Sequence, residues 1–298
     1  TTGVNSVLGS LSLGDGDHVL TTQHRYEAVA NTLARNAEAW GAQVIEARVP
    51  FPLRDPAEII AAFEEAWTPS TRLLVIDHIT SPTALVLPVR ELTQLAHSRG
   101  AQVLVDAAHA PGQLDVAIHE LGVDYWTGNL HKWVCAPRGA ALLWVAPPHR
   151  GRIHHPVTSL GWQQEFPAEF DWTGTDDPSP WLACTTAMDL HDSWGGARLR
   201  SSNHALVREA RVLIADALKV ELPHPDDPTL YGSMATIPLP GRAQDAPDIW
   251  NALIENHKIE VPVISWDERL WVRISGYAYN QPEEYQRLAE ALCSICID

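Results

Sequence analysis

A lysine and an aspartate lie next to apolar runs of the sequence, where a charged side chain is unusual. Lys132 follows a histidine in "YWTGNLHKWVCAPRGAALLWV", shortly before an apolar run, and Asp106 directly follows the apolar "VLV". A lysine in such a turn is either a solvated surface charge or a nucleophilic amine held at the edge of a sheet. A buried carboxylate needs a facing cation, and the two candidates are Lys132 itself and a protonated ring nitrogen. These two residues are the first candidates for chemistry.

Strands and helices alternate through the first half of the sequence and decide where these side chains lie. Apolar runs predict strands near residues 18–22, 42–49, 72–79, 101–110, 124–128 and 139–146. Helical spacing lies between them, for example from Tyr26 to Trp40, with Gly41 as the residue that ends the helix. This order predicts an α/β fold with a mainly parallel central sheet and helices on both of its faces.

Polar residues gather at the predicted carboxyl ends of the strands. They are His24, residues 78–81, residues 106–109 and residues 129–132. In open parallel sheets, ligands bind outside this edge. The clustering therefore favours a functional role for Lys132 over a solvated loop charge.

The pattern changes after about residue 150. The stretch from His149 to Pro180 is rich in Pro, His, Trp and Asp and reads as an ordered loop. Helical signals return over about 181–218, short strands follow, and a final helix is predicted over about 282–295. We therefore expect a large domain over residues 1–175 and a smaller C-terminal α/β domain over residues 181–298.

Composition limits the classes of function. The 298 residues carry a formal net charge of −16, which argues against nucleic acid or an anionic membrane as a partner. No apolar run approaches the roughly 18 residues that a membrane span needs. Cys293 and Cys296 form a C-x-x-C motif, which we interpret as part of the packing of a helix, so no metal site is expected. The chain has only four cysteines and no pattern typical of a disulfide framework, and we therefore expect a cytoplasmic location. No phosphate-binding glycine motif follows a strand, which argues against a nucleotide-binding protein.

Three groups of motifs resemble a known family. "VDAAHAPGQ", "YWTGNLHKWVCAPRGAALLWV" and, far downstream, "WVRISGYAYN" are similar to the class V aminotransferase family of fold type I pyridoxal 5′-phosphate (PLP) enzymes. Within it, "NLHKWVCAPRG", "DHITSPTALVLPV" and "EFDWTGTDDPS" resemble the isopenicillin N epimerase-like branch. The resemblance implies a PLP-dependent transferase-like fold. The family's chains start well before the first residue here, so the N-terminal segment of the PLP-binding domain is expected to be out of view.

The resemblance also implies roles for the residues around the cofactor ring. Lys132 would form the aldimine with PLP and then move protons at the substrate Cα. Asp106 would pair with the pyridine N–H and stabilise the ring as an electron sink. His24 would stack on the ring, with Tyr26 as the alternative stacking or substrate-side residue. His109 matches a position near the phenolic oxygen of the cofactor.

Phosphate contacts are implied at a helix start and before the lysine. Thr1 and Thr2 precede the first predicted helix, where N–H groups attract anions, although ordinary helix capping would also use them. Asn129 and His131 match further phosphate contacts. Thr175, after a glycine, matches a segment that reaches the phosphate of a neighbouring subunit, so a homodimer is expected.

Substrate recognition and reaction type follow from the same resemblance. Arg273 matches the arginine that grips the substrate carboxylate with its planar fork. Ser81 stands where many relatives outside the epimerase-like branch have Asn. The segment "ENHKIEVPVISWDERL" lacks the cysteine that persulfide-forming desulfurases need. We therefore expect an enzyme acting at Cα of an amino acid or cysteine-derived conjugate through an aldimine and a quinonoid, as a C–S β-lyase or epimerase. The alternatives are an aminotransferase and a non-catalytic dimeric binding module on the same fold.

Overall fold

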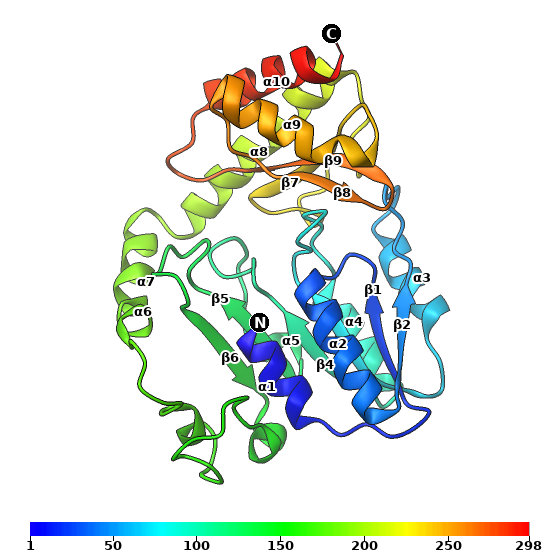
Figure 1. Cartoon of the computed structure of the whole chain (residues 1–298), viewed down its shortest axis with the longest axis vertical. Helices are drawn as coiled ribbons and strands as arrows, with labels where there is room; N and C mark the ends of the chain where they lie inside the picture. The colour runs from blue at the N-terminus through cyan, green and yellow to red at the C-terminus, as the bar shows by residue number, and fades with distance from the viewer. Residues whose placement is uncertain (298) are drawn as a thin grey trace. The chain divides into compact units, whose positions relative to one another are not determined.

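Two compact units make up the structure, a computed structural model that describes residues 1–297 (Figure 1). The first unit contains residues 1–49, 59–79 and 87–194. The second contains residues 50–58, residues 80–86 and the chain from Gly195 onward. Each unit is therefore built from segments that are not consecutive in the sequence.

A six-stranded sheet forms the centre of the first unit, in the order β2-β1-β3-β4-β5-β6. The strands are β1 (His18–Thr22), β2 (Gln43–Ala47), β3 (Thr71–Asp77), β4 (Gln102–Asp106), β5 (Tyr125–Asn129) and β6 (Ala141–Val145). The first five run parallel to their neighbours, and β6 runs antiparallel to β5. The mainly parallel sheet predicted from the sequence is confirmed.

Helices lie before, between and after these strands. They are α1 (Thr2–Ser10), α2 (Glu27–Trp40), α3 (Ala57–Ala66), α4 (Val89–Ser98), α5 (Ile118–Leu121), α6 (Ser179–Leu182) and α7 (Cys184–Ser193). Val4 of α1 and Leu33 of α2 pack with Leu73 on one face of the sheet. Leu74 and Val103 point to the other face and are also buried. Both faces of the sheet are therefore covered, as apolar strands require.

Local signals explain where several of these elements end. The predicted helix end at Gly41 is confirmed, because Gly41 adopts the left-handed conformation at φ 71° and closes α2. The loop predicted between His149 and Pro180 is irregular apart from short 3₁₀ helices at Pro147–Arg152 and Ala168–Phe170 and the start of α6. The parallel strands end at one edge of the sheet, and this edge carries the residues described below.

The second unit is a smaller α/β structure. Its antiparallel sheet has the order β7-β9-β8, formed by β7 (Met234–Pro238), β8 (Val263–Trp266) and β9 (Arg269–Ser275). The helices are α8 (Ala197–Leu218), α9 (Ala246–Ala252) and α10 (Pro282–Cys296), with a 3₁₀ turn at Ala243–Asp245 and a π turn at Leu253–His257. α8 packs against both α10 and β7.

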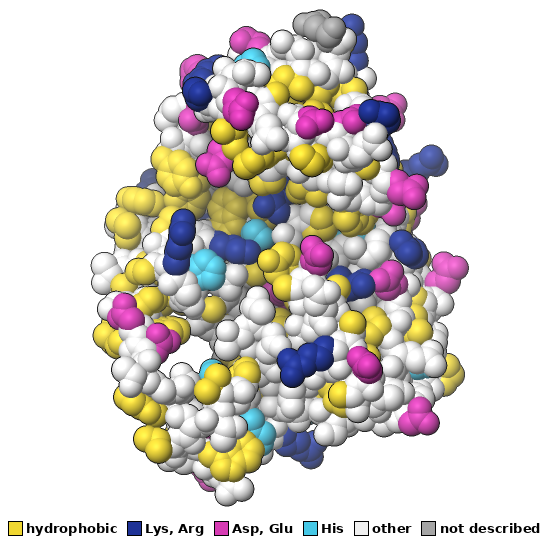
Figure 2. All heavy atoms as spheres, in the orientation of Figure 1, with side chains coloured by type: hydrophobic (Ala, Val, Ile, Leu, Met, Phe, Trp, Pro, Cys, Tyr) yellow, Lys and Arg dark blue, Asp and Glu magenta, His cyan; other side chains and the backbone are white. Residues whose placement is uncertain are grey.

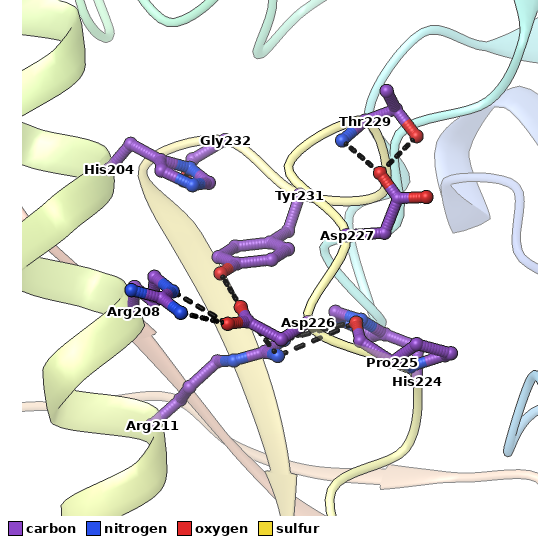
Figure 3. Close-up of polar contacts among 10 residues, drawn as sticks. All are labelled: His204, Arg208, Arg211, His224, Pro225, Asp226, Asp227, Thr229, Tyr231 and Gly232. Carbon is purple, nitrogen blue, oxygen red and sulfur yellow. Dashed lines mark hydrogen bonds and ion pairs between the residues drawn. The ribbon is translucent and has the colours of Figure 1, made fainter.

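A cluster of charged and aromatic residues fixes the Pro-rich segment before β7 to α8 (Figure 3). Asp226 accepts hydrogen bonds from the Tyr231 hydroxyl at 2.6 Å and from Arg208 Nε at 2.6 Å. Arg211, fully buried, lies 4.1 Å from the centre of the Tyr231 ring, and His204 stacks on the same ring at 4.5 Å. Two arginines and a hydroxyl thus neutralise one carboxylate and hold the pKa of Asp226 down to about 2, with the Arg208 hydrogen bond as the largest cause.

Among the described residues, none of the helices combines the length and the apolar character needed to cross a membrane.

Candidate active site

The amine of Lys132 lies in a turn after β5, against a histidine that follows β4. Lys132 Nζ is 3.0 Å from His109 Nε2, and the other ring nitrogen, Nδ1, accepts the indole N–H of Trp133 at 3.4 Å. The backbone carbonyl of His109 accepts a hydrogen bond from Gln113 Nε2 at 2.9 Å, which fixes this loop. The structure therefore brings together Lys132 and His109, which the sequence analysis had placed near one cofactor.

The hydrogen-bond pattern around His109 specifies proton positions. An indole N–H can only donate, so His109 Nδ1 acts as an acceptor and a neutral imidazole then carries its proton on Nε2. That N–H points to Lys132 Nζ, and an ammonium group has no lone pair with which to accept it. Both hydrogen bonds are satisfied together when the Lys132 amine is neutral. A neutral amine is the nucleophilic form of lysine.

Asp106 ends β4 as a buried carboxylate and is 6% exposed. Its Oδ1 accepts the backbone N–H of Ala108 at 3.0 Å. Within residues 1–297 no lysine, arginine or histidine lies within ion-pair distance of it, so it does not form the structural ion pair with Lys132 that the sequence left open. Burial raises the pKa of Asp106, and the hydrogen bond from Ala108 together with the more distant charges of the N-terminus and Lys132 offsets this effect only in part.

A second buried carboxyl group, Asp77, was not predicted from the sequence. It ends β3, is 4% exposed and pairs in register with Asp106 of β4. Burial first, and the charge of Asp106 second, raise the pKa of Asp77 well above its usual range. The signal that could have found it is its position directly after an apolar strand, which matches that of Asp106.

The start of α1 approaches the same edge of the sheet. Thr1 and Thr2 are exposed, and the Thr1 side chain makes no capping hydrogen bond to the helix, so simple capping does not account for it. A Cβ on Gly3 would lie 2.3 Å from Thr127 Oγ1, so only glycine allows the helix to come this close to β5. Thr127 is the register partner of Asp106. The predicted phosphate residues thus start a helix beside the Asp106 strand.

Asn129 and His131 lie on the other side of this edge, at the end of β5 and in the turn after it. Both the backbone N–H and the ring Nδ1 of His131 contact the Ala140 carbonyl oxygen, at 3.2 Å and 2.8 Å. Asn129 pairs with Ala141 at the start of β6. These contacts fix the turn that carries Lys132.

His24 and Tyr26 lie in the turn between β1 and α2. His24 is fully buried, and its Nε2 lies 3.1 Å from the Val49 carbonyl oxygen. Tyr26 is 45% exposed, and its backbone N–H hydrogen-bonds to the Asp77 carboxyl group. The structure thus gives His24 a fixed ring orientation and leaves Tyr26 the more accessible ring of the two.

Arg273 lies on β9 in the second unit and is partly buried. Its Nη1 donates to the backbone carbonyl of Ser81 and lies 3.3 Å from Ser81 Oγ. Its Nε is buried and has no hydrogen-bond partner among the residues described. Burial lowers the pKa of Arg273. The guanidinium is therefore oriented by Ser81 and keeps an unused N–H donor, which suits an anionic ligand.

Two further predictions concern loops. Thr175 lies exposed after Gly174, whose φ is 116°, and no hydrogen bond joins Thr175 to the Lys132 turn within the described part of the chain. The segment before Arg273 is a tight β8–β9 hairpin, in which Asp267 and Glu268 both have positive φ and Trp266 pairs with Arg269. This hairpin has neither a long loop nor a cysteine.

A lysine amine held by a histidine near a buried carboxylate that has no ion-pair partner is the kind of site that anchors a carbonyl-bearing, ring-nitrogen cofactor. The family model "Aminotransferase class-V" matches residues 1–288. The chain belongs to the class V aminotransferase family, whose cofactor is PLP. The donor set fits this group, because Asp106 has no cation within ion-pair distance among the described residues and the approach of Gly3 to Thr127 leaves the start of α1 at the same edge.

Relatives from bacteria and plants cover nearly the whole chain. Isopenicillin N epimerase from Streptomyces clavuligerus is 34% identical over 99% of this chain and 78% of its own length. A putative L-cysteine desulfhydrase from Oryza sativa subsp. japonica is 33% identical over 95% of this chain, which spans only 65% of that relative. L-cysteine desulfhydrase from Arabidopsis thaliana is 32% identical, over 95% of this chain and 68% of its length.

Solved structures share the fold. Cysteine desulfurase from Thermococcus onnurineus NA1 superposes with a TM-score of 0.78 at 21% identity, covering 99% of this chain and 78% of that one. A C-DES structure with glycine covalently linked to its PLP cofactor gives a TM-score of 0.77 at 22% identity, covering 98% and 78%. The PLP-dependent transferase-like fold expected from the sequence is confirmed.

Proposed function

We propose that this protein is a PLP-dependent enzyme that acts at Cα of a cysteine-derived amino acid and releases the sulfur group by β-elimination. Where the substrate has no leaving group at Cβ, the same residues would invert Cα. The observation that carries the proposal is the contact of 3.0 Å between Lys132 Nζ and His109 Nε2, at the sheet edge that also holds the buried carboxyl group of Asp106.

Each residue then has a role in the reaction. Bound PLP supplies a protonated ring that accepts the electrons of the broken Cα–H bond. Lys132 is the covalent anchor, and its released amine carries the proton taken from Cα. Asp106 faces the ring nitrogen, and His109 holds the Lys132 amine in place. His24 or Tyr26 supports the ring face, and Thr1, Thr2, Asn129 and His131 hold the phosphate.

The second unit supplies the substrate carboxylate site in this proposal. Arg273 is oriented through Ser81 and has an unused Nε–H donor. Two parallel N–H bonds from a guanidinium fix both the position and the tilt of a carboxylate. We propose accordingly that the first unit, built around the predicted domain of residues 1–175, binds PLP and that Arg273 binds the substrate carboxylate.

Sulfur elimination is favoured over persulfide transfer by the relatives and by one local feature. Several relatives are named L-cysteine desulfhydrases, and two are named isopenicillin N epimerase. The tight hairpin at Asp267–Glu268 carries no cysteine that would accept sulfur from a substrate. Release of a free thiol or sulfide is the outcome that this arrangement supports.

A product analysis tests the reaction type. The holoenzyme is incubated in deuterated water with L-cysteine, L-cystine, cysteine S-conjugates and a set of L- and D-amino acids. We expect pyruvate and ammonia from all the sulfur compounds, together with sulfide from L-cysteine, a thiol from the S-conjugates and cysteine persulfide from L-cystine. Any amino acid without a leaving group should gain Cα deuterium. Borohydride reduction and peptide mapping should place the pyridoxyl group on Lys132.

Other outcomes would contradict the proposal. Stoichiometric conversion to pyridoxamine phosphate, reversed by pyruvate or 2-oxoglutarate, would identify an aminotransferase instead. Failure to bind PLP, or PLP binding without Cα exchange for any compound, would identify a non-catalytic binding module. Label on a lysine other than Lys132 would remove the anchor assignment.

We further propose that the working unit is a homodimer. Of fourteen large hydrophobic side chains exposed in the described residues, nine lie between residues 157 and 194. They are Val157, Leu160, Trp162, Trp172, Trp181, Leu182, Met188, Leu190 and Trp194. Figure 2 shows hydrophobic side chains along the left edge, over the region of α6 and α7. The segment also contains Thr175, so a second copy covering it would bring that residue to the neighbour's phosphate.

A cytoplasmic location is proposed from the cysteines. The four cysteines at 135, 184, 293 and 296 are free thiols in the structure, including the C-x-x-C pair on α10. Free thiols persist in a reducing compartment. Fractionation of the expressing cells tests this proposal.

A further inference from the structure

Asp77 is a buried carboxyl group that has no role in the reaction proposed above. It is the last residue of β3, and its register partner is Asp106, the last residue of β4. Register partners on neighbouring parallel strands lie about 4.8 Å apart at the backbone and carry their side chains on the same face. Two carboxyl groups are therefore buried side by side at the edge where PLP is proposed to bind.

The surroundings do not compensate two negative charges. Within residues 1–297 neither carboxyl group forms an ion pair. Asp77 accepts the backbone N–H of Tyr26, and Asp106 accepts that of Ala108. Arg25 and Lys132 act on Asp77 from a distance, and each has another polar contact, to Glu46 and to His109. The ammonium group of Thr1 and Lys132 act on Asp106 in the same way, without reaching ion-pair distance.

The imidazole of His78 does not supply a positive charge to the pair. His78, next to Asp77 on the chain, is buried, and burial lowers its pKa to about 4. His78 is therefore neutral at pH 7, and its buried Nδ1 has no hydrogen-bond partner among the described residues. Two ionised carboxylates in this position would repel each other, and no cation among the described residues lies within ion-pair distance to offset the repulsion, so one proton removes most of that cost.

We propose that Asp77 and Asp106 form an acidic pair that holds one proton at neutral pH, with Asp77 protonated and Asp106 ionised. The assignment of the charge to Asp106 rests on the proposed function, in which Asp106 faces the ring nitrogen of PLP. Asp77 is then a positioning residue. It keeps a single negative charge beside the ring, and its bond to Tyr26 fixes the turn that carries His24.

The pair has a consequence at alkaline pH. When Asp77 loses its proton, a second negative charge appears beside Asp106 and strengthens the hold on a proton at the ring nitrogen. The pH dependence of the cofactor spectrum should therefore contain an alkaline transition that belongs to Asp77. Asp77→Asn imitates the protonated member and cannot ionise, so this transition disappears in that variant.

The first experiment uses the protein without cofactor. Carboxyl groups of aspartate are labelled with ¹³C and titrated by NMR, in the wild type and in Asp77→Asn. We expect one aspartate to remain protonated at pH 7 in the wild type, and this signal to be missing from Asp77→Asn. In the control, Asp124→Asn, the signal should remain, because Asp124 is a buried carboxylate bound to His97 and His149.

Two NMR results would overturn the acidic pair. If every aspartate of the wild type is ionised at pH 7, no shared proton exists, whatever the variants do. If the protonated signal survives in Asp77→Asn but vanishes in Asp106→Asn, the charge assignment is reversed. The wild-type spectrum decides the first question even where a variant folds poorly.

The second experiment uses the protein with PLP and keeps the two proposals separable. The absorbance of the bound cofactor is titrated in the wild type, Asp77→Asn and Asp124→Asn. Loss of the alkaline transition in Asp77→Asn alone is the expected result, and its persistence there would contradict the tuning role. If the wild type binds no PLP, the proposed function is wrong. The NMR titration still tests, independently, whether Asp77 and Asp106 share one proton.

Discussion

At the scale of residues, the chemistry depends on which charges are present around Asp106, His109 and Lys132 at the edge of the sheet. Asp106 has no cation within ion-pair distance in the described chain, and His109 accepts from Trp133 and faces Lys132. A bound cationic ring would restore the missing charge balance at Asp106. Without a cofactor, the buried negative charge of Asp106 has no ion-pair partner, and the protonated ring of the proposed cofactor would supply one.

Replacing Asp106 by asparagine tests this balance. Asp106→Asn keeps the shape but cannot hold a positive ring nitrogen. We expect turnover to fall by about a hundredfold or more, since each pKa unit lost at the ring is worth about 1.4 kcal/mol, whereas PLP content should stay high. Steady-state kinetics and cofactor absorbance measure the two effects. Asp124→Asn is the matched control, and equal loss of turnover there would argue against a specific role.

His224 gives a second residue-scale prediction, on stability. Burial lowers its pKa to about 4, below the usual 6.5. Between pH 6.5 and 4, His224 therefore binds a proton in the unfolded chain but stays neutral in the folded chain. The free energy of unfolding is highest above pH 6.5 and decreases as the pH falls toward 4. The loss is on the order of 3 kcal/mol.

Urea unfolding between pH 4 and 7 measures this effect. The slope of unfolding free energy against pH should be flatter in His224→Gln than in the wild type, even if the variant is less stable throughout. His119 is exposed, so His119→Gln should keep the wild-type slope. An unchanged slope in His224→Gln would assign the acid sensitivity to other groups.

At the scale of elements, strand ends and one helix start determine the site. β3, β4 and β5 end together and present Asp77, Asp106 and Asn129, while α1 approaches β5 through Gly3. The close approach depends on the absence of a side chain at Gly3, because a Cβ at this position would clash with Thr127. The geometry of the proposed phosphate site therefore depends on helix packing as well as on the residues that would touch the phosphate.

Two glycines of α1 provide a matched pair of variants. Gly3→Ala should destabilise the protein by about 1–3 kcal/mol through overpacking against Thr127 and should weaken PLP binding. Gly9→Ala meets no atom within 4 Å, so it should be neutral or stabilise by up to about 1 kcal/mol through helix propensity.

Urea unfolding and PLP titration of both variants check this prediction. Removing the neighbouring methyl and hydroxyl groups in Gly3→Ala/Thr127→Ala should recover part of the loss, because the two residues are in direct conflict. Similar behaviour of Gly3→Ala and Gly9→Ala would show that α1 adjusts without cost.

At the scale of the whole molecule, the proposed active sites are shared between two copies. Each site would take Lys132 and Asp106 from one subunit and Thr175 from the other. The exposed apolar stretch between residues 157 and 194 is where the second copy is proposed to bind. A shared site predicts that defects in different subunits complement each other.

Hybrid dimers test the sharing directly. Lys132→Ala and Thr175→Glu are each expected to be inactive, the latter because its charge repels the phosphate. After equal mixing and subunit exchange, about a quarter of all sites should be intact if pairing is random. Lys132→Ala mixed with Asp106→Asn should show no rescue, since both residues belong to the same subunit's site. A monomer by sedimentation would contradict the dimer.

Local patterns in the sequence were sufficient for a large part of this description. Apolar runs located the parallel strands, Gly41 marked a helix end, and the positions of Lys132 and Asp106 after apolar strands marked the functional edge. Such features depend on neighbours within a few residues, so a single sequence contains them. The family resemblance added roles for the remaining site residues, which stay predictions.

Contacts between distant segments were decided only by the tertiary structure. Asp77 lies beside Asp106 because of the register of β3 and β4, and Arg273 meets Ser81 across 192 residues of chain. His109 approaches Lys132 only once the turns after β4 and β5 are packed together. Register, helix approach and side-chain orientation are set by packing of the whole core, and the spacing of residues along the chain does not encode them.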